Sequence, residues 1–355
     1  MPNNGQPYDS GDRHGTTVAG VAAGVDNDTG IVGVAHGATI AGPRIGFNAD
    51  HSTSKLYFTF VEAKNFDIVN NSWGYGGYFY DNFNDLNSFG GATNPFVYIN
   101  QALIEAVELG RAHDTDPNVN LGTIFVVASG NDKLTNGSGL PDQNVNYHSF
   151  TSSPHTIAVS GYVQDGKDAT FATPGAAVLL AGPSTGVKTT DLTGSIGYHS
   201  TDYVSKSGTS YATPAVAGVA ALMLEANPNL GYRDVQEIFT LSSQFGDAND
   251  VDRMINGAGD WNGGGRHVSD ELGFGTLDAV RLAETWEKLG TYANLAEATV
   301  GSGSLNLTLD RNTVTHTITV ADQGIALDQV VLDLNMVHVR IGEVTVTLTS
   351  PDGTT

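Results

Sequence analysis

Two hydrophobic patterns divide the chain near residue 290. Between residues 14 and 290, short apolar runs alternate with helix-like segments, which is typical of an α/β domain with a mainly parallel sheet. From residue 295 onward, apolar residues alternate with polar ones, as Val344, Val346 and Leu348 do with the threonines between them. This period of two predicts an all-β domain of sandwich type. Its last residues form a turn signal with no returning strand, so we expect this second domain to be C-terminally incomplete.

Apolar runs in the first domain predict short buried strands. They cover residues 38–47, 66–73, 122–129, 155–162 and 176–182. A helix is predicted over 96–109, where Ile99, Leu103 and Ala106 repeat on one face. The segment that follows Ser210 is apolar on nearly every side, so we expect a central helix that is covered all round.

Composition restricts the partners and the chemistry. The chain has 355 residues, of which 40% are hydrophobic and 15% charged, enough for a large core and more than one domain. Its formal net charge of -22 argues against nucleic acid and anionic membranes as partners. The absence of cysteine excludes disulfides and a thiol nucleophile. No apolar run reaches the roughly 20 residues of a membrane span, and the first residues lack the pattern of a secretory signal.

Three separate stretches carry candidate catalytic side chains. The segment SGTSYATP places the hydroxyl of Ser210 where an apolar helix begins, and backbone N–H groups at a helix N-terminus favour developing negative charge. His14 lies in HGTTVAG, before a run of small residues, and Asn131 follows the buried run VVASG at the sheet edge where α/β sites gather. Taken singly, each has an ordinary structural explanation: a helix cap, a packed histidine and a turn asparagine.

Together, HGTTVAG, NNSWG, ASGN and SGTSYATP resemble the subtilisin-like serine proteases in the chain order His, Asn, Ser. The resemblance implies a three-layer α/β domain and a serine endopeptidase. It makes Ser210 the nucleophile, His14 the general base and later general acid, and Asn131 a donor to the oxyanion. The substrate it implies is a peptide or protein, held as an extended strand and in a pocket beneath it. The residues implied to hold it are Ser72, Trp73, Gly74, Ser129 and Gly130.

The stretches VAALMLEANPNLGYRDVQEIF and MVHVRIGEVTVTLTSPDGTT resemble the kexin and furin branch of these proteases and the start of its accessory P domain. We therefore expect a peptidase domain over 1–290 and a partial P domain over 295–355. The family's catalytic aspartate lies on a separate strand well upstream of the histidine. Asp9 and Asp12 are too close to His14 to take that place. We expect an N-terminally incomplete domain that by itself is weak or inactive.

The residues that set the cleavage preference depart from the branch pattern. Kexin-like enzymes cut after basic residues because acidic side chains line the substrate pocket. Here YGGYFYDN (75–82) replaces one acidic stretch, and His148 stands at another acidic position. Cleavage after Lys or Arg is therefore not assumed, although Asp81, Asp132 and Asp142 could still supply charge.

The segment GVDNDTGIVGVAHG (24–37) resembles a calcium loop of the family, in which an asparagine side chain and alternate backbone carbonyls bind the ion. Carried over, Asn27 supplies the side-chain oxygen, and Thr29 and Ile31 supply carbonyl oxygens. A surface turn rich in Asp and Asn is the alternative. The branch's second calcium site is not matched, because Thr173 stands at its glutamate position.

Two other functions stay open from the sequence. GTSYA (208–212) approximates the G-x-S-x-G elbow of α/β-hydrolases, and Asp252 and His267 follow in the order of an esterase triad, although Ala212 replaces the last glycine. A chain that truly lacks the aspartate would instead be a catalytically dead, peptide-binding pseudoprotease. For the protease, the family resemblance implies an extracellular or periplasmic location.

Overall fold

The computed structural model divides into two compact units, Met1–Ala293 and Asn294–Thr355. The assignment of 1–290 as a peptidase domain and 295–355 as a partial P domain stays a prediction. The residues that the structure describes are 7, 11–45, 53–76, 79, 81–83, 94–114, 116, 118–133, 143–245, 254–255, 265–277, 298–305, 307–308, 313–321, 329–337 and 344–350.

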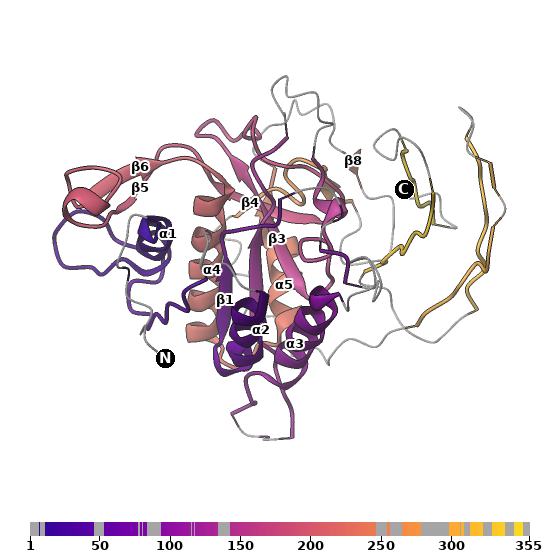
Figure 1. Cartoon of the computed structure of the whole chain (residues 1–355), viewed down its shortest axis with the longest axis horizontal. Coiled ribbons are helices and arrows are strands. Elements are labelled where there is room, and N and C mark those ends of the chain that lie inside the picture. The colour runs from indigo at the N-terminus through magenta and orange to yellow at the C-terminus, as the bar shows by residue number, and fades with distance from the viewer. Residues whose placement is uncertain are drawn as a thin grey trace. The chain divides into compact units, whose positions relative to one another are not determined.

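The first unit contains helices and strands in mixed order (Figure 1). Its α-helices are α1 (Arg13–Ala23), α2 (Thr53–Glu62), α3 (Pro95–Leu109), α4 (Thr209–Ala226) and α5 (Tyr232–Ser242). Its strands are β1 (Ile68–Asn71), β2 (Ile124–Ala128), β3 (Thr156–Tyr162), β4 (Val178–Pro183), β5 (Val187–Thr190), β6 (Tyr203–Lys206), β7 (Ser243–Gln244), β8 (Met254–Ile255), β9 (His267–Val268) and β10 (Thr276–Leu277). Its short 3-10 helices are η1 (Ala63–Asn65), η2 (Val145–Tyr147) and η3 (Gly194–Ile196).

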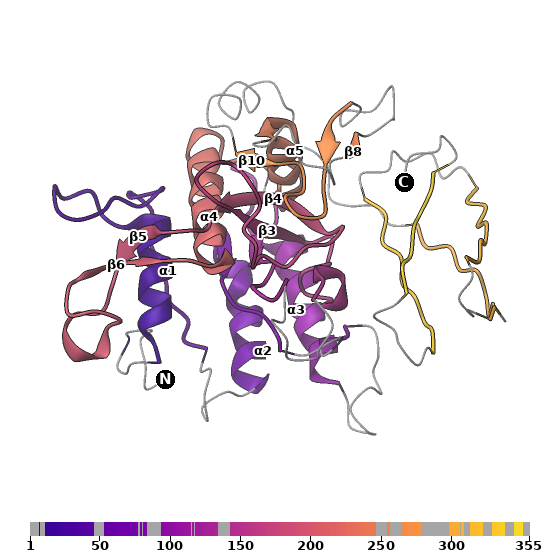
Figure 2. The same ribbon diagram turned by 90° about the horizontal axis from the view of Figure 1, so that it is seen from above.

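The main sheet is mostly parallel. Within the described residues its strand order is β1-β2-β3-β4-β10-β7, and only β7 pairs in the antiparallel sense. Every residue of β2 is buried, because helices cover both faces of a parallel sheet. Figure 2 shows the layers, with α2 and α3 on one face and α4 and α5 on the other. The predicted three-layer α/β fold with a mainly parallel sheet is confirmed.

Most of the predicted elements occur. The runs at 66–73, 122–129, 155–162 and 176–182 contain β1, β2, β3 and β4, and α3 covers the helix predicted over 96–109. The strand predicted over 38–47 is wrong for residues 38–45, which are largely exposed and form no strand; 46–47 lie outside the described residues. No described strand lies beside 38–45 to pair with its backbone N–H and C=O groups, and Arg44 instead forms an ion pair with Asp12 at 2.7 Å.

Helix α4 runs through the middle of the first unit. Its residues from Thr209 to Gly218 are buried apart from Ser210, so the predicted all-round cover holds for this part of the helix. Near its C-terminal end Leu222 and Glu225 are exposed, and there the prediction fails. The N-terminal end of α4, where Ser210 lies, is therefore fixed by packing on most sides.

Helix α1 packs on the hairpin formed by β5 and β6 at one side of this unit (Figure 1). Two threonine hydroxyls of β5 donate to backbone carbonyls of α1: Thr189 Oγ1 to Thr17 at 2.6 Å and Thr190 Oγ1 to Thr16 at 2.9 Å. Gly20 makes this approach possible, because a Cβ at that position would collide with both threonine hydroxyls. The hairpin thereby sets the position of α1.

In the described part of the second unit, no residue belongs to a helix or strand. Apolar residues of the period-two pattern are exposed there, among them Val330, Leu332 and Val346. The predicted β-sandwich and its likeness to a P domain are not confirmed. No helix in the described portion of the chain is both long and apolar enough to cross a membrane.

Candidate active site

A proline four residues after Ser210 creates an acceptor at the start of α4. Pro214 has no N–H, so the Ser210 carbonyl lacks its usual helical partner. The hydroxyl of Ser72 donates to that carbonyl at 2.9 Å, and Asn70 Nδ2 donates to the Ser72 hydroxyl at 3.0 Å. These bonds tie the end of β1 to the residue predicted to be the nucleophile.

The Ser210 hydroxyl donates to the backbone carbonyl of Ser72 at 3.2 Å. Ser210 is the second residue of α4, whose N-cap is Gly208, so the alternative of a helix-capping serine is wrong. No hydrogen bond joins Ser210 to His14 among the described contacts. Catalytic hydrogen bonds are often long in unliganded sites and tighten when substrate binds.

Asn131 lies beside the same helix end. Its Oδ1 accepts the backbone N–H of Thr209 at 2.8 Å and the Thr209 hydroxyl at 3.1 Å. Because a backbone N–H can only donate, these bonds fix the amide orientation and leave Nδ2 as a donor. The Ser210 N–H has no partner among the described residues, as expected in the first turn of a helix. Two donors at this position can stabilise an oxyanion.

His14 is the second residue of α1 and meets the residue next to Ser210. Its ring centroid lies 6.0 Å from that of Tyr211, edge to face. Thr17 Oγ1 donates to the His14 carbonyl at 2.7 Å, so the Tyr211 hydroxyl, 3.3 Å away, is the donor to Thr17. Burial lowers the pKa of His14 below its usual 6.5, and the charge of Lys206 lowers it further. A neutral imidazole is the form that can accept a proton.

No described carboxylate forms a hydrogen bond with His14. Asp12 is engaged with Arg44 at 2.7 Å, and Asp9 lies outside the described residues. Among the described residues, the imidazole of His14 therefore has no acidic hydrogen-bond partner.

The predicted substrate residues lie next to Ser210 and Asn131 in the chain or in space. Trp73 stacks on Phe150 with ring centroids 5.4 Å apart, while Gly74 is exposed and its surroundings are open. Ser129 follows β2 and has a buried hydroxyl without a hydrogen-bond partner. Gly130 has a φ of 112° that glycine adopts freely, and its carbonyl accepts the Thr209 hydroxyl at 3.2 Å. Of these residues Gly74 is exposed, whereas Ser72 and Ser129 are buried.

Asp81 is paired inside the protein. Its side chain is fully buried, with Oδ1 2.7 Å from His148 Nδ1 and Oδ2 accepting the Phe150 N–H at 2.9 Å. These contacts use both oxygens, so Asp81 does not present a free carboxylate to a substrate. Asp132 is exposed, and Asp142 lies outside the described residues.

Residues 25–30 of the predicted calcium loop are exposed. Asn27 Oδ1 accepts the Thr29 N–H at 3.2 Å, and the Thr29 carbonyl accepts the Tyr203 hydroxyl at 3.4 Å. Two of the three expected oxygen ligands therefore already accept a hydrogen bond; the third expected ligand is the Ile31 carbonyl. The described residues contain no group of three or more His, Asp or Glu side chains able to hold a metal. Thr173 is buried and its hydroxyl accepts the Asp132 N–H at 3.1 Å.

Sequence reasoning missed three supporting residues. Thr209 orients Asn131, Asn70 supports Ser72, and Tyr211 contacts the His14 ring. A signal existed for one contact only, because Pro214 four residues after Ser210 implies a carbonyl that needs an outside donor.

Sequence comparisons find related proteins over most of the chain. The subtilase family model matches residues 1–275. Proprotein convertase subtilisin/kexin type 4 of Homo sapiens is 31% identical over 350 residues, which are 96% of this chain and 42% of the relative. Furin-like protease 1, isoform 1-CRR, of Drosophila melanogaster is 31% identical over 292 residues, 79% of this chain and 23% of the relative. The chain thus spans less than half the length of these two relatives.

Solved structures share the fold. The serine protease of Aeromonas sobria superposes with a TM-score of 0.67 at 22% identity, over 84% of this chain and 58% of that one. Fervidolysin from Fervidobacterium pennivorans gives a TM-score of 0.53 at 20% identity, over 78% of this chain and 36% of that one. The resemblance to subtilisin-like proteases and to their kexin and furin branch is confirmed.

Proposed function

The chain belongs to the subtilase family of serine peptidases, and from this premise we propose that it is an endopeptidase that hydrolyses peptide bonds through an acyl-enzyme on Ser210. The Ser210 Oγ attacks the scissile carbonyl carbon while its proton passes to His14. The oxyanion that forms accepts hydrogen bonds from Asn131 Nδ2 and the Ser210 N–H. The C–N bond then breaks, His14 returns the proton to the leaving amine, and water hydrolyses the ester.

The observation that carries this proposal is the double anchoring of the α4 N-terminus. Thr209 binds Asn131 and Ser210 binds Ser72, so the oxyanion donors and the strand edge adjoin one hydroxyl. An extended peptide lying along Ser72, Trp73 and Gly74 would pair with their backbone, and Ser129 and Gly130 would line the pocket below it. The His14–Tyr211 ring contact brings the imidazole to the residue next to the nucleophile.

Labelling with a fluorophosphonate probe, together with hydrolysis of a quenched peptide library, tests the proposal. We expect His14→Ala to abolish labelling of Ser210 and His267→Ala to leave it. The reverse result would favour the esterase triad, and labelling independent of both would contradict the mechanism. The esterase reading is already weakened, because Ser210 follows β6 of a two-stranded hairpin rather than a strand of the parallel sheet.

The pseudoprotease alternative rests on the missing aspartate. It predicts peptide binding without turnover, both here and in any longer form of the chain. The protease proposal predicts that this chain alone is weak or inactive and that an extended form carrying an upstream aspartate is much faster, by about 3 × 10⁴ in turnover. Equal turnover of the two forms would contradict the role assigned to that aspartate.

The cleavage preference follows from the pairing of Asp81. Because this carboxylate is held by His148 and the Phe150 N–H, we propose that cleavage does not require a basic residue before the scissile bond. Peptides that differ only in Arg or Leu at that position should be cleaved at similar rates. A strong preference for Arg that disappears in Asp81→Asn would show that the carboxylate reaches the substrate.

A calcium ion at the 24–37 loop is a further proposal from the family. Asn27, Thr29 and Ile31 offer three oxygens, fewer than the six to eight that Ca²⁺ takes, so other oxygens would have to complete the shell. The bound ion would stabilise the loop that follows α1. Heat unfolding with calcium and with excess chelator tests this, and an unchanged midpoint would contradict it. An extracellular or periplasmic location is proposed on the same family grounds.

A further inference from the structure

Two cationic side chains share one aromatic ring beside His14. The Arg13 guanidinium carbon lies 4.2 Å from the ring centroid of Tyr198, and the Lys206 ammonium lies 3.7 Å from it. Arg13 directly precedes His14, and Lys206 ends β6 four residues before Ser210. Segments far apart in the sequence thus bring two positive charges to the catalytic residues.

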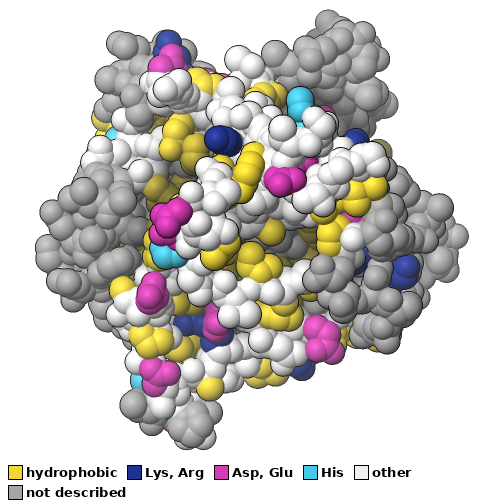
Figure 3. All heavy atoms as spheres, turned by 90° about the vertical axis from the view of Figure 1, so that its left-hand side faces the viewer, with side chains coloured by type: hydrophobic (Ala, Val, Ile, Leu, Met, Phe, Trp, Pro, Cys, Tyr) yellow, Lys and Arg dark blue, Asp and Glu magenta, His cyan; other side chains and the backbone are white. Residues whose placement is uncertain are grey.

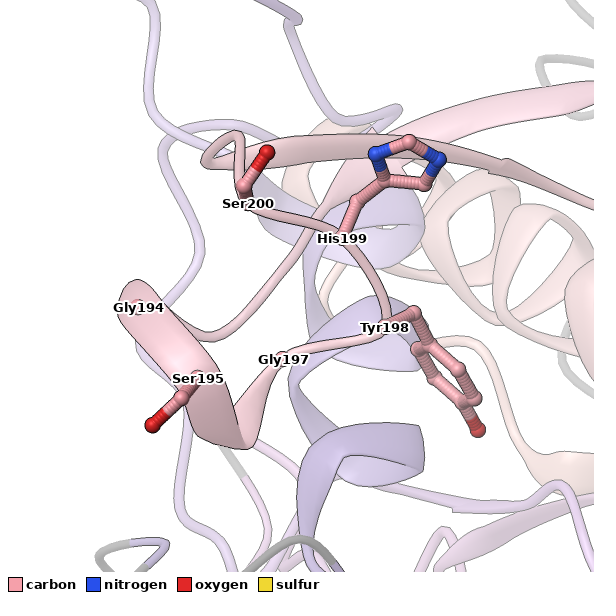
Figure 4. Close-up of a pocket in the computed structure, with 6 residues that line it drawn as sticks. All are labelled: Gly194, Ser195, Gly197, Tyr198, His199 and Ser200. Atoms are coloured by element: carbon pink, nitrogen blue, oxygen red, sulfur yellow. The ribbon is translucent and has the colours of Figure 1, made fainter.

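The loop that carries Tyr198 is pinned from inside. Asp191 uses both carboxylate oxygens to accept the backbone N–H groups of Leu192, Tyr198 and His199, at 2.8 to 3.0 Å. A hollow of about 560 Å³ lies along residues 194–200. In Figure 4 Tyr198 extends away from His199 and Ser200, so this hollow has no converging polar groups of its own. The fixed ring of Tyr198, rather than the hollow, is the organised feature.

Neither cation forms an ion pair with a residue that the structure describes. In the described part of the chain no carboxylate lies within ion-pair distance of Arg13 or Lys206, although the formal net charge is -22. Asp191 interacts with Arg13 only through longer-range electrostatic attraction, without an ion pair. Figure 3 shows the face that carries α1 and the hairpin, where acidic and basic side chains are scattered and not gathered by sign. The cation pair is therefore a local feature.

The mechanism places this pair on the leaving-group side of the substrate. His14 gives its proton to the departing amine, so that half of the substrate must lie against the imidazole. The acyl half lies along Ser72 to Gly74. Burial and then the charge of Lys206 lower the pKa of His14, so both disfavour the imidazolium that forms during the reaction. A negative charge on the substrate at this point would offset that unfavourable effect.

We propose that Arg13 and Lys206 form a subsite for an acidic side chain on the residue that directly follows the cleaved bond. This rests on the proposed function and names a substrate class for it: peptides with Asp or Glu on the leaving-group side. Tyr198 is the positioning residue, since its ring holds both cations.

Partitioning of the acyl-enzyme tests the subsite without depending on overall speed. The chain is acylated by a p-nitrophenyl ester of a blocked peptide and offered equal amounts of Glu-Gly amide and Gln-Gly amide. The amine nitrogen attacks the acyl carbon, the ester C–O bond to Ser210 breaks, and His14 moves the proton from the amine to the Ser210 oxygen. We expect the Glu product to exceed the Gln product about threefold to tenfold, less at high salt.

Variants separate the subsite from general charge effects. Lys206→Gln should bring the product ratio close to one, and Arg13→Gln should lower it independently. Lys188→Gln removes an exposed lysine of the same hairpin and should leave the ratio unchanged. Heat unfolding of each variant checks that it folds. Equal products in the unmodified chain, or a ratio that neither variant changes, overturns the subsite. Where the unmodified chain is too slow, an extended form that carries the upstream aspartate replaces it. Failure of that form to turn over the ester at all overturns the proposed function itself.

Discussion

The regions around Ser210 and around His14 are built differently. Near Ser210 the contacts are hydrogen bonds to backbone groups, at 2.9 Å from Ser72 and 2.8 Å from Thr209 to Asn131. Near His14 the contacts are a ring pair at 6.0 Å and a hydroxyl bridge of 3.3 Å between Tyr211 and Thr17. The first region belongs to the parallel sheet and its central helix. The second is a helix held in place by a hairpin and one tyrosine.

This difference indicates which part of the site is rigid. Displacing Ser210 or Asn131 would break hydrogen bonds to backbone groups at the start of α4, a helix whose first half is otherwise buried and resists small movements. Displacing His14 would disturb weaker contacts at one side of the unit. We therefore expect changes near Ser210 to act on kcat, and changes near His14 to act also on pH dependence.

The largest effect is expected for the nucleophile. In an extended form that carries the upstream aspartate, Ser210→Ala should lower kcat by about 10⁶-fold, the size of loss that removing the nucleophile causes in a complete triad. Hydrolysis of a quenched peptide measures it. Ser205→Ala, an exposed serine on the adjoining β6, is the matched control and should keep full activity. Retained hydrolysis in Ser210→Ala would show that Ser210 is not the nucleophile.

The second effect concerns Asn131, the proposed oxyanion donor. Asn131→Asp keeps an oxygen for the Thr209 N–H but replaces the Nδ2 donor with a negative charge. We expect kcat to fall by at least about 10²- to 10³-fold, while KM and the midpoint of heat unfolding change little. A large fall in that midpoint with little change in kcat would instead make Asn131 a purely structural residue.

A smaller effect is expected where the two regions meet. Tyr211→Phe keeps the ring against His14 but removes the hydroxyl that donates to Thr17. The free energy of unfolding should fall by about 1 kcal/mol, and kcat/KM by roughly fivefold. Tyr203→Phe removes the hydroxyl that donates to Thr29, away from the site, and serves as the matched control. Equal kinetics in the two variants would show that Tyr211 does not position His14.

The smallest effect is a shift in pH dependence. Because burial and then Lys206 lower the pKa of His14, the acid limb of kcat/KM should have its midpoint below 6.5. Lys206→Gln removes a charge that opposes protonation, so the midpoint should move upward, and activity should begin to fall at a higher pH. Lys188→Gln should leave it in place. Movement in the opposite direction would contradict the assigned cause.

The same titration affects stability. The imidazole binds a proton less readily in the folded chain than in the unfolded chain, so the unfolded state gains from protonation. Stability should therefore be fully present above pH 6.5 and fall as the pH drops through the folded pKa.

The main sheet could be predicted because its buried strands are short apolar runs between helices. The run at 38–47 has the same apolar character, but a strand also needs a neighbour to pair with, and periodicity along one chain does not reveal it. The period-two pattern beyond residue 295 has the same limit. It marks residues such as Val330 and Val346 as suited to one face of a sheet, yet they are exposed where the structure describes them.

The sequence by itself determined the catalytic candidates His14, Asn131 and Ser210, since each lies in a short motif whose chemistry is local. Only the tertiary structure decided what surrounds them. Asp81 is hydrogen-bonded to His148, 67 residues away along the chain, and the ring of Tyr198 contacts Arg13 and Lys206 from two separate segments. The energies of ion pairs and ring contacts depend on the distance between the groups in space. The order of residues along the chain does not fix these distances, which are set only when the chain folds.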